Sequence, residues 1–380
     1  MARQIINKIN RVYDYLLAKG VSTKVIDFRL KAFSFKDAPA EGEQEWIQKW
    51  SSLGKPNPKL YRLYSGFIGA DPNIVPDDIM SNVIEPVLNP VRYRSTYEDK
   101  NMIDRFLVAN YHRKVVPDTV LRNINTIFFD KEYRQLFPSE INQFLKKIEY
   151  NRIIIKPSID ANSGKGILFF DKNELTGTYY EINGGDKLSY EFLLSNYKEN
   201  YIIQECIKQS DFMSQFCKTS INTFRMHAYR SVSDNTPLVL GSVLRMGGEG
   251  SLLDNMHAGG GAVGVDDYGR LFNYKRDQNG IYNTIHNNID LRNEYIIPNY
   301  KECLDFGASI LNALPHCRNL ALDIMIGEDG LPMLIEYNTD KFGCDVFQMT
   351  VGSLFGNYTD EVIDYCKINK DKQTRIFVTF

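Results

Sequence analysis

Two short apolar runs around an Asp-Gly turn place the strongest constraint on how this chain can fold. Residues 324–335 read IMIGEDGLPMLI, which is typical of a β-hairpin with a two-residue loop. In that register Asp323 lies opposite Glu336, and Asn338 projects from the same face as Glu336 because strand side chains alternate. Like charges placed opposite each other destabilise a sheet, so either a hard cation lies between them or the hairpin rim is simply hydrated. Asp323, Glu336 and Asn338 are therefore the predicted metal ligands, although a three-residue loop would break their facing.

The composition describes an ordinary globular protein. With 380 residues, 43% of them hydrophobic and 24% charged, the chain can form two or three domains. A net charge of −2 and the absence of any Lys/Arg-rich run argue against nucleic acid as a partner. No apolar run approaches the roughly 20 residues of a membrane span, and no secretory pattern opens the chain. The six cysteines are scattered, which predicts a cytoplasmic protein without disulfides or zinc.

The predicted secondary structure divides the chain into four segments. Residues 1–95 are predicted to form a partly helical N-terminal region, and residues 96–150 a lobe that precedes the main strands. Residues 151–210 contain strands and a glycine loop, and residues 211–380 contain the remaining strands and the metal ligands. Hairpin-type turns outnumber βαβ units, so the predicted fold class is α+β with largely antiparallel sheets.

A lysine and a small-residue loop follow the buried strand that precedes residue 156. Glycines let backbone N–H groups approach phosphate oxygens, and Lys156 beside them supplies a positive charge. The spacing is not that of a Walker A loop, and an ordinary hairpin is the alternative interpretation. The predicted loop residues are Ser163, Gly164, Lys165 and Gly166.

A second candidate is the end of the strand near residue 204. A strand end of this kind can present main-chain donors and acceptors to the edge of an adenine, although any strand end has the same appearance. The residues concerned are Gln204, Glu205, Cys206 and Ile207.

Two arginines mark a third candidate. Arg225 and Arg245 are equidistant from Asn235, so in a symmetric hairpin they would face each other. Two adjacent cations favour an anion between them, such as a phosphate or a carboxylate, unless each is paired with an ordinary surface acid. A glycine-dense stretch follows and is typical of a pliable substrate loop. The predicted substrate residues here are Asn222, Asp254, Asn255, Gly259 and Gly260.

The order of these features resembles the ATP-grasp superfamily, in particular its sugar-transfer-associated branch. The resemblance covers residues 98 to 357 approximately. Its most specific parts are Ile155-Lys156-Pro157, residues 220–225, residues 244–247, Asp254-Asn255 with the glycines at 259–261, and residues 335–338. The glycine loop is poorer in glycine than this pattern leads one to expect.

The resemblance implies a nucleotide held between two α+β subdomains, with residues 1–95 as an additional region. Lys100 would join Lys156 on the phosphates, and the segment from Gln204 to Ile207 would form the hinge that reads adenine. The metal ligands would hold one or two Mg²⁺ ions, while Arg225 and Arg245 would steady phosphate and the reacting acyl group.

The function that follows is that of an ADP-forming carboxylate–amine ligase. It would form a C–N bond through an acyl phosphate, with Arg225, Arg245 and Lys156 as catalytic residues. The substrates would be a small-molecule carboxylate and an amine, either of which could be linked to a sugar, within a cell-surface polysaccharide or glycoconjugate precursor. The alternatives are a kinase that phosphorylates a hydroxyl group and a non-catalytic nucleotide sensor.

Overall fold

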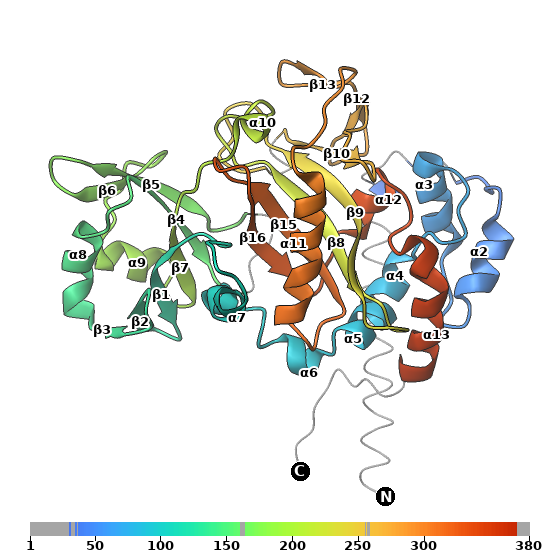
Figure 1. Ribbon diagram of the computed structural model, residues 1–380, viewed down its shortest axis with the longest axis horizontal. Helices are drawn as coiled ribbons and strands as arrows, with labels where there is room; N and C mark the ends of the chain where they lie inside the picture. The colour runs from blue at the N-terminus through green and yellow to red at the C-terminus, as the bar shows by residue number, and fades with distance from the viewer. Residues whose placement is uncertain are drawn as a thin grey trace, which may run out of the picture. The chain divides into compact units, whose positions relative to one another are not determined.

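The computed structural model describes residues 30–31, 35, 37–159, 164–254, 256 and 259–370 (Figure 1). Most of the first 36 residues of the predicted N-terminal region, together with Ser163 and Asn255, lie outside the described residues. The chain divides into two compact units. The small unit comprises Thr96–Ser210 and Met325–Glu336, and the large unit comprises the described parts of Met1–Ser95, Asp211–Ile324 and Tyr337–Phe380.

An antiparallel sheet of order β3-β2-β1-β7-β4-β5-β6 forms the centre of the small unit. Its strands are β1 (Thr119–Ile124), β2 (Ile127–Asp130), β3 (Gln135–Leu136), β4 (Arg152–Pro157), β5 (Leu168–Asn173), β6 (Thr178–Glu181) and β7 (Tyr201–Glu205). Its helices are η2 (Lys100–Met102), α7 (Ile103–Leu107), η3 (Val108–Asn110), α8 (Pro138–Lys146) and α9 (Tyr190–Asn196).

The two faces of this sheet differ in chemistry. Ile153, Ile155 and Ile203 lie in a buried cluster with apolar residues of α8 and α9. The alternate residues project from the opposite face, where Ile154 pairs with Gln204 and Lys156 pairs with Ile202. The apolar run of β4 therefore buries one face against helices and presents Lys156 on the same face as Gln204.

The second antiparallel sheet has the order β12-β11-β10-β9-β8-β15-β16 and belongs to the large unit, except for the residues of β15 and β16 that fall within Met325–Glu336 and are assigned to the small unit. Its strands are β8 (Thr223–Arg230), β9 (Pro237–Met246), β10 (Gly261–Val265), β11 (Lys275–Arg276), β12 (Tyr282–Asn283), β15 (Asn319–Ile326) and β16 (Pro332–Asn338), with β13 (Ile285–His286) and β14 (Ile289–Asp290) as a separate pair. Its helices are α2 (Glu43–Trp50), α3 (Pro58–Ile68), α4 (Asp77–Ile79), η1 (Met80–Ile84), α5 (Glu85–Leu88), α6 (Val91–Arg94), α10 (Asp211–Ser214), α11 (Tyr300–Ala313), α12 (Cys344–Gln348), η5 (Gly356–Tyr358) and α13 (Thr359–Asn369).

Helices cover both faces of this second sheet. The helix α11 packs against β8 and β9 (Figure 1). On the opposite face Tyr229, Val243 and Ala321 share a buried cluster with α2, α3, α12 and α13. Because strand side chains alternate, Asp323 projects from the same face as Ala321. The described N-terminal helices thus pack on the sheet face that carries the predicted metal ligand.

The turn between β15 and β16 differs from the predicted two-residue loop. The N–H of Gly327 donates to the carbonyl oxygen of Leu331 at 2.9 Å, so the loop has three residues, and Gly330 within it has a φ of 77°. The predicted two-residue loop is therefore wrong by one residue at the turn itself. An extra residue is accommodated because a turn with one glycine in the left-handed region closes as easily as a two-residue turn.

Strand β16 also changes phase along its length. Leu334 and Tyr337 are both buried although three positions separate them, so the alternation shifts between these residues. Such a shift is typical of a β-bulge. Glu336 and Asn338 then both project from the side of the strand opposite Tyr337, as their spacing of two residues predicts.

The predicted α+β class with antiparallel sheets is confirmed. Among the described residues, no helix is long and apolar enough to cross a membrane.

Candidate functional site

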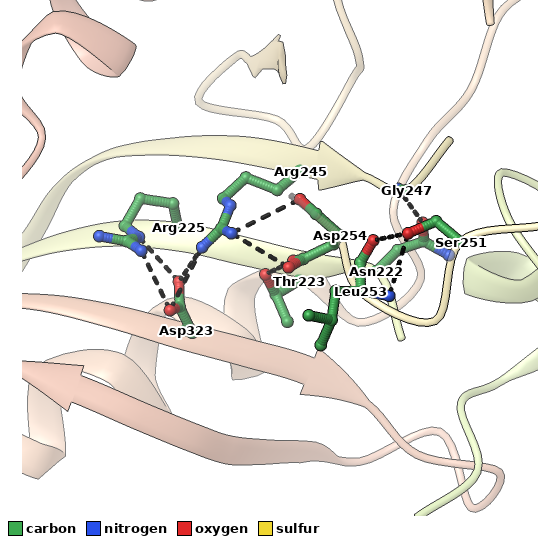
Figure 2. Close-up of polar contacts among 9 residues, drawn as sticks. All are labelled: Asn222, Thr223, Arg225, Arg245, Gly247, Ser251, Leu253, Asp254 and Asp323. Carbon is green, nitrogen blue, oxygen red and sulfur yellow. Dashed lines mark hydrogen bonds and ion pairs between the residues drawn. The ribbon is translucent and has the colours of Figure 1, made fainter. Parts of the chain in front are cut away.

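Asp323 lies at the centre of an ion-pair network on the sheet of the large unit (Figure 2). Its carboxylate accepts hydrogen bonds from Nε and Nη2 of Arg225 at 2.7 and 3.1 Å. Nη1 of Arg245 lies 3.3 Å from each oxygen of the same carboxylate. Asp323 is 4% exposed, so the two guanidinium groups compensate a nearly buried charge.

The two arginines share a face but do not lie directly opposite each other. Thr223 pairs with Arg245 and Arg225 pairs with Val243, so the predicted symmetric facing is wrong by two positions. The cause is the position of the turn: Arg230 pairs with Pro237, so the hairpin is not centred on Asn235, and the register shift between His227 and Ala228 returns the pairing by one position. A displacement of two residues preserves the face, and the anion between the arginines is the side chain of Asp323, which pairs directly with Arg225 across the strands.

Asp254 extends the network beyond Arg245. Its Oδ1 lies 3.0 Å from Nη2 of Arg245, and its Oδ2 accepts a hydrogen bond from the hydroxyl of Thr223 (Figure 2). Burial raises the pKa of Asp254, whereas the charge of Arg245 lowers it. The four charged groups alternate in sign from Arg225 through Asp323 and Arg245 to Asp254.

The side-chain amide of Asn222 forms hydrogen bonds with backbone groups. Its Nδ2 donates to the carbonyl oxygens of Met213 and Cys217 at 2.8 and 3.0 Å, and its Oδ1 accepts from the N–H of Gly247 at 3.2 Å. The side chain is fully buried. A substrate contact by Asn222 would require these bonds to change.

Close backbone approach explains the glycines in this region. A Cβ at Gly247 would lie 2.1 Å from the hydroxyl of Ser220, so a side chain does not fit there. Gly259 has a φ of 82°, and a Cβ there would lie 3.9 Å from the Cα of Gly248. Gly260 is buried beside the start of β10. The two glycine-dense stretches therefore run next to each other at the ends of β9 and β10.

In the small unit, Lys100 and Glu336 come together. Nζ of Lys100 lies 3.6 Å from Oε2 of Glu336, and the N–H of Lys100 donates to the carbonyl oxygen of Ser158 at 2.9 Å. The second bond ties the turn that carries Lys100 to the residue two positions beyond Lys156. Two predicted phosphate-binding lysines are thus connected through the end of β4.

The glycine loop returns toward the same strand end. Gly164 and Gly166 both have a φ of 74°, a region in which other residues are strained. A Cβ at Gly166 would lie 2.9 Å from the ring of Pro157, so the loop passes directly beside the residue after Lys156. Lys165 lies between these two glycines and is exposed.

The strand end at Gln204 contains one buried acceptor without a partner. Nε2 of Gln204 donates to the hydroxyl of Thr119 at 3.3 Å, while Oε1 is buried and has no hydrogen-bond partner among the described residues. The N–H groups of Glu205 and Cys206 donate to Asp118 and Arg152 main-chain oxygens at 3.1 Å. Of the polar side-chain atoms at this strand end, the buried Oε1 of Gln204 is thus the acceptor without a partner among the described residues.

The remaining side chains of this segment have other roles. Glu205 accepts from the N–H of Asp118 at 2.7 Å and forms an ion pair with Lys114. Burial raises the pKa of Cys206 to about 12, which keeps its thiol protonated.

Two supporting groups escaped prediction from the sequence. The guanidinium of Arg122 is fully buried, donates to the carbonyl oxygen of Asn101 and pairs with Asp104, which fixes the turn that begins at Lys100. The Lys114–Glu205 pair fixes the strand end at residue 205. A single charged residue within an apolar strand, as Arg122 is in β1, was the available signal.

The predicted metal ligands offer a suitable set of donors. Asp323, Glu336 and Asn338 supply carboxylate and amide oxygens, which hard divalent cations prefer. Nδ2 of Asn338 is buried without a hydrogen-bond partner in the described part of the chain, but it is an N–H donor, and a metal ion would be bound by Oδ1 of this side chain. His227, by contrast, is bonded to Leu354 and Asn319, and burial lowers its pKa to about 4, which makes it a neutral core residue.

Comparison with known proteins identifies the family. The family model described as sugar-transfer associated ATP-grasp matches residues 80–362. The chain belongs to the sugar-transfer-associated ATP-grasp family. The match begins within the N-terminal helices of the large unit, so this ATP-grasp protein shares with its family more than the predicted start near residue 98. No curated protein matches the chain.

Solved structures of similar fold include three ligases. The D-cycloserine synthetase DcsG is 11% identical, with a TM-score of 0.41 and coverage of 73% of each chain. The ATP-grasp ligase PsnB, complexed with a minimal precursor, is 11% identical, with a TM-score of 0.38 and coverage of 73% of this chain. The D-alanine–D-alanine ligase from Bacillus anthracis is 14% identical, with a TM-score of 0.36 and coverage of 72% and 69%. This chain spans 63% of the length of the PsnB chain.

Proposed function

We propose that this ATP-grasp protein is an ATP- and Mg²⁺-dependent ligase that joins a carboxylate to an amine. The observation that carries the proposal is the pairing of two guanidinium groups on Asp323, next to the strand that bears Glu336 and Asn338. A ligase must bring a carboxylate to a triphosphate against charge repulsion, and paired arginines reduce that repulsion. Membership of the family and the fold shared with ligases support the same interpretation.

The small unit supplies the groups that would hold the nucleotide. Lys100 and Lys156 would bind phosphate oxygens, with the N–H groups of the loop at residues 164–166. The unpartnered Oε1 of Gln204 would accept a hydrogen bond from the exocyclic amine of the base. Magnesium, when bound by Asp323, Glu336 and Asn338, would neutralise charge on the phosphates.

The reaction would proceed in two balanced steps. A carboxylate oxygen of the first substrate attacks the γ-phosphorus, the bond to the β-phosphate oxygen breaks, and ADP leaves. The amine of the second substrate then attacks the acyl carbon, phosphate leaves, and the amine loses a proton. Arg225 and Arg245 would bind the carboxylate in the first step and the developing oxyanion in the second.

The substrates proposed are a small-molecule carboxylate and an amine, at least one of them linked to a sugar. This part rests on the description of the family, which associates it with sugar transfer. A cell-surface polysaccharide or glycoconjugate precursor fits this description, and the cytoplasm, where ATP is available, is the proposed compartment.

Mass spectrometry of a desalted metabolite extract tests the proposal. The extract receives the protein with Mg-ATP, and parallel reactions contain Lys156→Ala or Lys131→Ala. Lys131 is 72% exposed and serves as the matched control. The expected result is a species equal to two metabolites minus water, formed with ADP by the wild type and by the Lys131 variant only.

Other outcomes point to the two alternatives. Detection of a metabolite that has gained a phosphoryl group would favour a kinase over a ligase, because a kinase needs the same triphosphate-binding residues. ATP binding without ADP formation in extracts that contain the full range of sugar-linked acids would favour the nucleotide sensor and overturn the proposal.

A further inference from the structure

Asn89 uses its whole hydrogen-bonding capacity at the ends of the two strands that carry the proposed metal ligands. Its Nδ2 donates to the carbonyl oxygens of Asn319 and Thr339, the latter at 2.7 Å. Its Oδ1 accepts from the N–H groups of Arg318 and Asn319 at 2.9 and 3.1 Å. A primary amide has two N–H donors and two acceptor lone pairs, so all four are used.

These partners lie at the ends of the two strands that carry the proposed metal ligands. Asn319 is the first residue of β15, and Thr339 is the residue directly after β16. Asn89 therefore links the beginning of the strand that bears Asp323 to the end of the strand that bears Asn338. The side chain is fully buried, so water cannot replace these bonds.

Two neighbouring side chains hold the same segment. The N–H of Phe342 donates to Oε1 of Glu85 at 3.4 Å, and Nη2 of Arg94 lies 3.0 Å from Oδ2 of Asp340. Glu85, Asn89 and Arg94 come from a single stretch of ten residues, which we call the brace. The brace contacts Thr339, Asp340 and Phe342, immediately beyond Asn338.

A brace is needed here because β16 is an edge strand. It is the last strand in the order of its sheet and has a single sheet neighbour, although the N–H of Leu334 also donates to the carbonyl oxygen of Val115 at 2.8 Å. An edge strand is held by half the ladder hydrogen bonds of a central strand, so its end is the part of the sheet most easily displaced. Ligands for a metal ion must be held to within a fraction of an ångström.

Local structure fixes Asn89 itself. It ends α5, and its N–H donates to the carbonyl oxygen of Glu85 at 2.8 Å. Pro90 follows and disfavours continuation of the helix through residue 89. The amide is thus presented from a short helix that is buried in the core of the large unit.

We propose that Asn89 is a positioning residue, which sets the geometry of the metal ligands Asp323 and Asn338 through Asn319 and Thr339. The inference rests on the proposed function, because it needs these residues to bind a divalent cation. It also assigns a role to the stretch of the N-terminal region that contains the brace: it supports the strands that carry the metal ligands.

The test compares Asn89→Ala with a control of equal burial. Gln348 is also a fully buried amide in the large unit, and it joins the backbone of Val75 through bonds of 2.6 and 3.0 Å without touching β15 or β16. Mn²⁺ binding to the full chain is measured by electron paramagnetic resonance, without nucleotide, alongside thermal unfolding of each protein.

The expected result separates position from stability. Asn89→Ala and Gln348→Ala should both lower the Tm, but only Asn89→Ala should weaken Mn²⁺ binding, by about tenfold, as loss of an outer support of a metal ligand does. An equal effect of the two variants on Mn²⁺ affinity, or no effect of either, overturns the inference and leaves the proposed function intact. A wild type that binds no Mn²⁺ overturns the proposed function instead.

A milder variant keeps the test valid if Asn89→Ala does not fold. Arg94→Ala removes the contact with Asp340 at a side chain that is 13% exposed. It should weaken Mn²⁺ binding in the same direction with a smaller loss of Tm. Unchanged Mn²⁺ affinity in Arg94→Ala would count against the brace.

Discussion

At the scale of single residues, Asp323 has two competing sets of cations. Its carboxylate is bound by Arg225 and Arg245, yet the proposed reaction needs the same carboxylate as a metal ligand. Attraction between unit charges at contact distance in a partly buried site is worth several kcal/mol, so the two arrangements cannot be independent. Binding of the metal should free the arginines for the substrate carboxylate.

Arg225→Ala tests this competition. Loss of Arg225 leaves a nearly buried carboxylate with one fewer partner, which should lower the free energy of unfolding by roughly 1–3 kcal/mol. Mg²⁺ should then raise the Tm of the variant more than that of the wild type, because the ion no longer displaces Arg225. The measurement is thermal unfolding over a series of MgCl₂ concentrations without nucleotide.

A surface pair provides the control for this experiment. Arg152 and Asp171 form an ion pair at 2.6 Å with side chains 47% and 49% exposed, and Arg152→Ala should change neither the Tm nor its dependence on Mg²⁺ appreciably. A smaller Mg²⁺ effect in Arg225→Ala than in the wild type would contradict the competition.

At the scale of elements, helices tolerate glycine for different reasons. Gly66 lies in α3, is exposed, and would bring a Cβ into open space. Gly307 lies in α11, is buried, and would place a Cβ 3.0 Å from Val239 and 3.4 Å from Met226. The first glycine reflects sequence freedom, whereas the second lets α11 approach the sheet that carries Asp323.

The two glycines predict opposite effects of alanine. Gly66→Ala should raise the free energy of unfolding by about 0.5–1 kcal/mol, because alanine loses less conformational entropy in a helix. Gly307→Ala gains the same conformational-entropy benefit, but its new Cβ is packed too closely against its neighbours. This overpacking costs about 1–3 kcal/mol, so the free energy of unfolding should fall. Urea unfolding of both variants measures the difference, and a stabilised Gly307→Ala would show that α11 can shift away from β9.

At the scale of the whole molecule, the stability of the large unit depends on pH through Glu85. Burial, and then the nearby charge of Asp340, raise the pKa of this carboxyl to about 7, while Arg94 and backbone N–H groups lower it. The folded protein therefore retains a proton that the unfolded chain loses near pH 4.5. The stabilisation is complete below that value and is lost as the pH rises through about 7.

Glu85→Gln should remove this dependence. Between pH 5 and pH 8 the wild type should lose stability, on the order of 3 kcal/mol from this group, and the variant should lose correspondingly less. Urea unfolding followed by tryptophan fluorescence is suitable because both tryptophans, Trp46 and Trp50, are fully buried in the large unit. Parallel pH profiles for the two proteins would exclude Glu85 as the source.

Local pattern was sufficient for the fold class, and it singled out candidate residues whose roles stay predictions. Alternating apolar residues and Asp-Gly or glycine-rich turns set antiparallel strands, because burial of one sheet face requires period 2 and reversal requires residues that accept unusual backbone angles. The family resemblance rested on motifs of this local kind, and the match to the family model confirms it. The spacing of two residues between Glu336 and Asn338 also predicts, from sequence alone, that their side chains project from one side of the strand.

Only the tertiary structure decided the registers and the partners of these residues. A third residue in the β15–β16 loop and the position of the turn between β8 and β9 set the pairings near each turn, since turn geometry depends on what each strand packs against. The anion between Arg225 and Arg245 is Asp323, which lies 98 and 78 positions away from them along the chain, and Asn89 bonds to Thr339 across 250 positions. Contacts at such separations leave no periodic signal in the sequence, because they arise from how whole elements pack and not from any local preference of the chain.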